Sequence, residues 1–184
     1  VSMHQTGAAH LDLHPATIWV EPDPQGMPLA QLLPAGQGGA ATPAMVVAYR
    51  PPEQLADGMA TGYWSDVYAL GAAFFHALTG QPPFGAQDEG QVRAGHLQGP
   101  PPSVVAYRPD LHPGVAAALQ QALDKVPARR PPNVMALLQS LEAFLYAPGA
   151  AAAPPYGAQA AGGPPARKSS AGIVVLLASL GVLA

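Results

Sequence analysis

The segment His10–Val20, which reads HLDLHPATIWV, concentrates side chains that are able to do chemistry. The carboxylate of Asp12 can accept a proton from a hydroxyl group, which is the role of a general base. His10 and His14 are four residues apart, a spacing that would place two metal ligands on one face of a helix. Pro15 and its loop-like surroundings disfavour a helix at this point. We therefore expect no metal ion to bind there.

The glycine-rich stretch Gly36–Thr42, GQGGAAT, is a second candidate for ligand binding. It matches neither a Walker loop nor a dinucleotide-binding fingerprint. It also lies within Pro34–Ala44, which contains few large apolar residues. We interpret it as part of a mobile loop and not as a phosphate cradle.

The element that must position the first segment is a long helix over Ser65–Thr79. Ser65 is a candidate N-cap, and Asp66 follows in the first turn, where the helix dipole favours a negative charge. Gly80 suits the left-handed position after the last turn, and two prolines follow it. Apolar residues surround nearly the whole helix, which predicts a place in the centre of a domain.

The remaining pattern predicts a mainly α fold. Further helices are expected over Asp88–Leu97, from about Pro113, and over Asn133–Tyr146. Strands are expected only as short pieces near Ile18–Val20 and Leu29–Leu33. The paired prolines in YRPPEQ, Tyr49–Gln54, exclude a regular helix across them.

Composition divides the 184 residues into three parts. Residues 1–146 are the globular domain, 147–170 an Ala/Pro/Gly-rich linker expected to be disordered, and 171–184 an apolar tail helix. The net charge of −3 gives no reason to expect nucleic-acid binding, and the absence of cysteine excludes thiol chemistry. Because the chain starts at Val1 and ends within an apolar run, we expect a fragment of a longer protein.

Three motifs in register resemble the eukaryotic-type Ser/Thr protein kinases of bacteria. The helix SDVYALGAAFFHALTGQPPF is similar to the central helix of the kinase C-terminal lobe, YRPPEQ to the end of the activation segment, and KVPARRP to the Pro-x-x-Arg-Pro segment between late helices. The resemblance extends from about His10 to Tyr146. It implies a kinase-like large lobe, and no sequence for a small lobe precedes His10.

The resemblance assigns structural roles to four residues. Glu53 should pair with Arg130, and Asp66 should accept hydrogen bonds from the backbone of the loop that contains His10. Considered singly, Asp66 could be only a partner of the helix dipole, and Glu53 and Arg130 could be solvated surface charges. The register of the three motifs favours the structural roles.

The catalytic positions depart from the family. His10 and Asp12 match its histidine and catalytic aspartate, so Asp12 is expected to be a vestigial proton acceptor. The other matched positions carry unsuitable side chains. Leu11 replaces an arginine, His14 a phosphate-contacting lysine, Thr17 a metal-binding asparagine, Pro34 a magnesium-binding aspartate and Val46 a threonine. The two lysines, Lys125 in an expected late helix and Lys168 before the tail, cannot serve as the nucleotide lysine. The family uses ATP and magnesium; for this chain we expect no cofactor.

Three functions remain open: a membrane-linked pseudokinase that binds a protein partner or a separate kinase, a fragment of an active membrane-anchored kinase, and a helical membrane adaptor. The tail, Ala171–Ala184, is apolar over 14 residues, whereas a spanning helix needs about 20. We interpret it as part of a single membrane span, with Arg167 and Lys168 on the cytoplasmic side. A short buried or interfacial helix is the alternative. The expected location is the cell membrane, with the kinase-like lobe in the cytoplasm.

Overall fold

A computed structural model describes residues 8–24, 28–39, 42–85 and 88–145 of the protein. The described chain is mainly helical, as predicted, with one small antiparallel sheet. In chain order its elements are η2 (Pro15–Thr17), β1 (Ile18–Pro22), β2 (Pro28–Leu32), α1 (Pro43–Val47), α2 (Pro52–Leu55), α3 (Tyr63–Thr79), α4 (Glu89–Gln98), η3 (Val104–Ala106), α5 (Pro113–Ala122), η4 (Pro127–Arg129) and α6 (Val134–Leu145).

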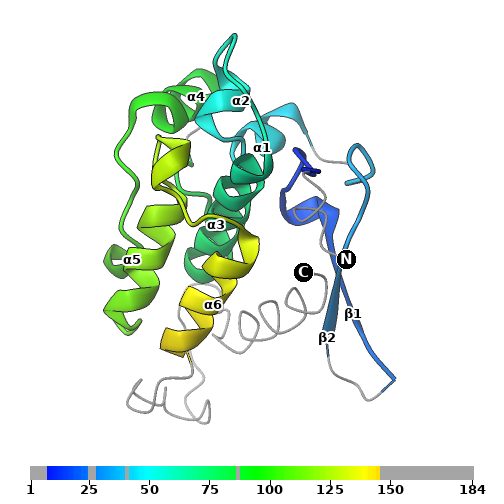
Figure 1. The fold of residues 1–184 in the computed structure, drawn as a ribbon, viewed down its shortest axis with the longest axis vertical. Helices are drawn as coiled ribbons and strands as arrows, with labels where there is room; N and C mark the ends of the chain where they lie inside the picture. Colours follow the sequence, from blue (N-terminus) through cyan, green and yellow to red (C-terminus); the bar gives the residue numbers. More distant parts are fainter. Residues whose placement is uncertain (1–7, 25–27, 40–41, 86–87, 146–184) are drawn as a thin grey trace, which may run out of the picture.

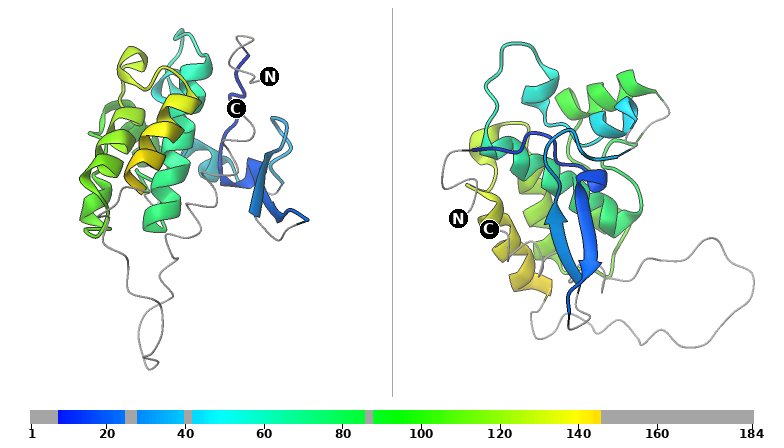
Figure 2. Two further views of the ribbon diagram at one scale, coloured as in Figure 1. Left: turned by 60° about the horizontal axis from the view of Figure 1, so that its bottom comes forward. Right: turned by 90° about the vertical axis from the view of Figure 1, so that its right-hand side faces the viewer.

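Helix α3 lies in the centre of the molecule, between α5 and α6 on one side and the β1–β2 hairpin on the other (Figures 1 and 2). Every residue from Ser65 to Phe75 is buried. This confirms the central position predicted from the apolar surface of the helix, since only a central position can bury all its faces. Helices α1, α2 and α4 gather at one end of α3 (Figure 1).

The start of α3 differs from the prediction. The helix begins at Tyr63 after the N-cap residue Gly62, so Ser65 is the third helical residue and not the cap. The Ser65 hydroxyl accepts the Gly62 N–H at 3.3 Å and donates to the Glu53 carboxylate at 2.8 Å. Ser65 thus bonds both to the residue that caps its own helix and to a side chain in α2. At the other end Gly80 has a φ of 82° and closes the helix as expected.

The other helices follow their predicted limits within one or two residues. Asp88 caps α4 through the N–H groups of Gly90 and Gln91, and Asn133 accepts the Ala136 N–H at 2.8 Å at the start of α6. The short helices α1 and α2 were not predicted. Each has a proline in its first turn, where the missing N–H costs nothing, and α1 begins inside the stretch expected to be a mobile loop.

The β1–β2 hairpin matches the two predicted strand pieces. Its register pairs Ile18 with Leu32 and Val20 with Ala30. Ala30 is fully buried and belongs to the core, whereas Trp19 is 57% exposed. The hairpin therefore meets the core through Ala30 and Ile18, while most of β1 is exposed.

The predicted linker, 147–170, and tail, 171–184, lie outside the described residues. Among the helices that the structure does describe, none has both the length and the apolar character needed to cross a membrane.

Candidate functional site

The loop that contains His10 and Asp12 is held by the first turn of α3. The buried carboxylate of Asp66 accepts the backbone N–H of His10 at 2.7 Å and that of Leu11 at 2.8 Å. Leu11 has a φ of 60°, the left-handed region that a branched residue rarely adopts. The Gln54 side chain donates to the Leu11 carbonyl at 2.8 Å. These contacts fix a backbone conformation whose strain is of the order of 1–3 kcal/mol.

Both ring nitrogens of His10 have partners within the fold. Nε2 lies 2.7 Å from the Leu33 carbonyl and must donate to it, while Nδ1 accepts the backbone N–H of Asp12 at 3.3 Å. These two bonds place a proton on Nε2 and use Nδ1 as the acceptor. His10 therefore ties the loop to the end of β2, and neither nitrogen is available to a metal ion.

The Asp12 carboxylate is 23% exposed and has two neighbours. Its Oδ2 accepts the backbone N–H of Gly36 at 2.7 Å, and its Oδ1 lies 3.7 Å from Nε2 of His14. The contact with Gly36 joins Asp12 to the Pro34-Ala35-Gly36 turn. Proton acceptance by Asp12 remains a prediction.

The resemblance matches His14 to a phosphate-contacting lysine, but the surroundings of this ring do not favour a charge. Its side chain is only 3% exposed, and burial lowers its pKa, with Asp12 opposing and His10 and Arg50 reinforcing that shift. A neutral ring carries no charge to stabilise a phosphate. Nδ1 of His14 is buried and has no hydrogen-bond partner among the described residues. The ring packs so tightly on Gly38 that a Cβ atom there would lie 2.6 Å from it.

Thr17, which the resemblance matches to a metal-binding asparagine, is fully buried. Its hydroxyl accepts the His14 N–H at 3.1 Å and shares its one proton between the carbonyls of His14, at 2.8 Å, and Asp12, at 3.1 Å. The hydroxyl thus closes the loop on itself and presents no oxygen to solvent. Pro34, which the resemblance matches to a magnesium-binding aspartate, is exposed and has no side-chain oxygen. No cluster of three or more potential metal ligands occurs among the described residues.

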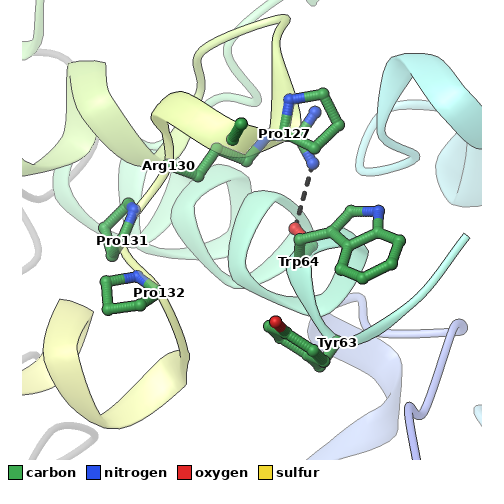
Figure 3. A pocket seen from close by; sticks show the side chains of 7 residues that line it. Tyr63, Trp64, Pro127, Arg130, Pro131 and Pro132 are labelled. Atoms are coloured by element: carbon green, nitrogen blue, oxygen red, sulfur yellow. Dashed lines mark hydrogen bonds between the residues drawn. The ribbon is translucent and has the colours of Figure 1, made fainter.

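Glu53 and Arg130 form the ion pair that the resemblance implies. Both side chains are fully buried, and the guanidinium binds the carboxylate through two hydrogen bonds of 2.6 and 2.8 Å. Burial alone would raise the pKa of Glu53, but the hydrogen bonds and charge of Arg130, with the Ser65 hydroxyl, outweigh it and lower that pKa. Arg130 also donates to the carbonyls of Trp64 (Figure 3), Asp124 and Lys125.

Of three other residues singled out in the sequence, the structure describes two, Val46 and Lys125. Val46 lies in α1. Lys125 lies in the loop after α5, not in a helix; its ammonium group donates to the Gly95 carbonyl at 3.0 Å and sits 4.1 Å from the centre of the Phe84 ring. Burial, followed by the charge of Arg130, lowers the pKa of Lys125 to about 8. Lys168 is outside the described residues.

Sequence reasoning missed the contacts that complete the loop, namely Gly36 with Asp12 and Gln54 with Leu11. Each joins residues that are more than 20 positions apart, and backbone donors and acceptors carry no sequence signal of their own. The glycine at position 36 was the only available hint, because its φ of 79° needs glycine.

Comparison with known proteins identifies relatives for this chain. It is 34% identical over 156 residues to the serine/threonine-protein kinase PknJ of Mycobacterium tuberculosis, covering 78% of this chain and 26% of PknJ. It is 32% identical over 155 residues to the serine/threonine-protein kinase pkn3 of Myxococcus xanthus, covering 76% and 28%. It is 36% identical over 138 residues to the serine/threonine-protein kinase PknF of M. tuberculosis, covering 69% and 28%.

No family model matches the sequence. The chain spans about a quarter of the length of these curated relatives. Its homologues are bacterial serine/threonine-protein kinases, which supports the resemblance drawn from the three motifs.

Proposed function

We propose that this chain is a catalytically inactive lobe of a serine/threonine-kinase-like signalling protein and acts by binding a protein partner. The observation that carries the proposal is the state of Thr17. A fully buried hydroxyl that bonds only within its own loop cannot reach a metal ion. Phosphoryl transfer depends mainly on metal and cationic stabilisation of the phosphate charge, and neither Pro34 nor the neutral, buried His14 replaces it.

An active kinase fragment is the second candidate, and the geometry of Asp12 favours it. Its carboxylate stays partly exposed, and the Asp66 contacts hold the loop in one conformation. A positioned general base contributes typically about 10²–10⁴-fold to a rate. This contribution to the rate is small beside the stabilisation that metal ions and cationic side chains give to the phosphate charge, so we rank this candidate second.

Manganese binding separates the two candidates without relying on turnover. Free Mn²⁺ gives a strong electron paramagnetic resonance signal that weakens when the ion is held by a protein. With ATP and the full 184-residue chain, we expect the signal to equal that of ATP and Mn²⁺ alone. A weaker signal that returns to this level in Asp12→Asn would overturn the proposal, because it would show a metal–nucleotide site at this loop.

We also propose that the lobe is linked to a membrane through residues 171–184, with the lobe on the cytoplasmic side. The proposal rests on the apolar run and on Arg167 and Lys168 before it. In cells, the natural polypeptide should stay with membranes after alkaline carbonate extraction. Its release by carbonate would rule out a spanning segment.

A further inference from the structure

A surface pocket of about 440 Å³ lies where the first turn of α3 meets the loop before α6 (Figure 3). Its principal lining residues are Tyr63, Trp64, Pro127, Arg130, Pro131 and Pro132. The rings of Tyr63 and Trp64 meet edge to face, with centroids 5.0 Å apart. Apart from the one arginine, the pocket is lined by two aromatic residues, three prolines and Ala128.

The arginine in this pocket cannot attract an anion. A guanidinium has five N–H donors, and Arg130 directs all of them at Glu53 and at the carbonyls of Trp64, Asp124 and Lys125. Its charge is also neutralised by the Glu53 carboxylate. An occupant suited to this pocket is therefore uncharged and apolar, not an acidic or phosphorylated group.

The chain itself contains a segment of that chemistry. Residues 147–166 read APGAAAAPPYGAQAAGGPPA and include no charged side chain. Within them Pro154, Pro155 and Tyr156 are consecutive. Proline-rich segments adopt the extended polyproline II conformation at little entropic cost and are recognised by aromatic-lined grooves.

The distance along the chain permits this contact. Helix α6 has 12 residues and starts at Val134, two positions after Pro132, so it carries the chain about 18 Å away from the pocket. Eight residues lie between Leu145 and Pro154, and the nine steps along the chain span roughly 28 Å in the polyproline II conformation. The segment can therefore return along α6 to the pocket.

We propose that Pro154, Pro155 and Tyr156 of the same chain dock in this pocket, against Tyr63 and Trp64. The docked segment would cover the first turn of α3, directly above the Glu53–Arg130 pair. This inference does not depend on whether the loop around Asp12 is active.

A spin label tests the contact in the full chain, which has no cysteine of its own. Gly157→Cys carries the label, and the reporter is the indole N–H signal of Trp64 in a nitrogen-15 spectrum recorded in mild detergent. Trp19→Phe identifies which of the two indole signals belongs to Trp64. We expect the oxidised label to broaden the Trp64 signal and its reduction to restore it.

Two matched variants separate docking from mere tethering. Changing Pro154, Pro155 and Tyr156 to alanine should reduce the broadening at least twofold, whereas Pro164→Ala with Pro165→Ala should leave it unchanged. Equal broadening in all three chains would overturn the proposal. Broadening that also appears when labelled and nitrogen-15 chains are mixed would assign the pocket to a second copy, and it too would overturn docking within one chain.

Discussion

At the scale of a single residue, Arg130 contacts three other parts of the chain. Its guanidinium contacts Glu53 in α2, the Trp64 carbonyl in α3 and two carbonyls in the loop after α5. Because both charges of the pair are out of water, removing one leaves the other uncompensated. The ion pair therefore controls the stability of this end of the molecule.

Glu53→Ala is expected to lower the free energy of unfolding by about 3–5 kcal/mol. The change isolates the buried charge of Arg130 and also removes the acceptor of the Ser65 hydroxyl. Urea denaturation followed by circular dichroism measures the loss. Asp57→Ala is the matched control, since Asp57 is an exposed carboxylate four positions away, and it should change the stability by less than about 0.5 kcal/mol. Similar losses in both variants would contradict the contact.

His96 should make the stability depend on pH. Its ring is fully buried between the Tyr68 hydroxyl, 2.8 Å from Nδ1, and the Ala48 carbonyl, 3.0 Å from Nε2, with Lys125 and Phe84 beside it. Burial, followed by the charge of Lys125, lowers its pKa from 6.5 to about 4. The unfolded chain then binds more protons between these values, so stability present above pH 6.5 is lost as the pH falls towards 4.

The loss expected from His96 over this range is about 3 kcal/mol. His14, whose pKa is also lowered, acts in the same direction, whereas Glu53 contributes only below its ordinary pKa of 4.5. Denaturation curves recorded from pH 7.5 to 4 measure the slope. His96→Gln should flatten it, because glutamine cannot titrate; an unchanged slope would show that His96 is not the group responsible.

At the scale of secondary-structure elements, α3 and α5 pack closely where Gly71 meets Ala122. A Cβ atom added at Gly71 would lie 2.8 Å from the Cβ of Ala122, so the two helices meet at a glycine. Gly71→Ala would favour the helix by up to about 1 kcal/mol in isolation. In the fold it should instead lower the stability by about 1–3 kcal/mol, because overpacking forces the helices apart.

A second substitution distinguishes this steric effect from other causes. Ala122→Gly restores the space at the crossing, so the double variant should be more stable than the sum of the two single changes predicts. Thermal unfolding of the four proteins provides the cycle. Additive losses would mean that the two residues do not limit the approach of α3 to α5.

The elements predicted best from the sequence are those with a strong local signal. Gly80 and the apolar surface of α3 marked that helix, whereas the two strands were expected only as short pieces and their pairing was not predicted. The start of α3 was misplaced because Ser65 is engaged by Glu53, a residue 12 positions away. Helix α1 was missed because its apolar pattern is only five residues long. In the candidate site, residue types could be matched from the motifs, but the enclosure of Thr17 and His14 depends on packing that no local pattern encodes.

At the scale of the whole molecule, α3 and the chain that follows β2 both hold the loop that contains His10 and Asp12. Asp66 holds the loop from α3, and His10 and Gly36 tie it to the chain that follows β2. Within this arrangement Asp12 stays partly exposed, whereas Thr17 and His14 are buried. We propose that this architecture preserves the shape of a kinase lobe without its metal-dependent chemistry.

The most direct test is transfer of phosphate from radiolabelled ATP to a generic basic protein, with magnesium and then with manganese. The full 184-residue chain is compared with its Asp12→Asn variant, which keeps the size of the side chain but removes the proton acceptor. We predict no incorporation above the buffer background in either protein. Incorporation by the unchanged chain that disappears in Asp12→Asn would contradict the account and identify the loop as a working catalytic site.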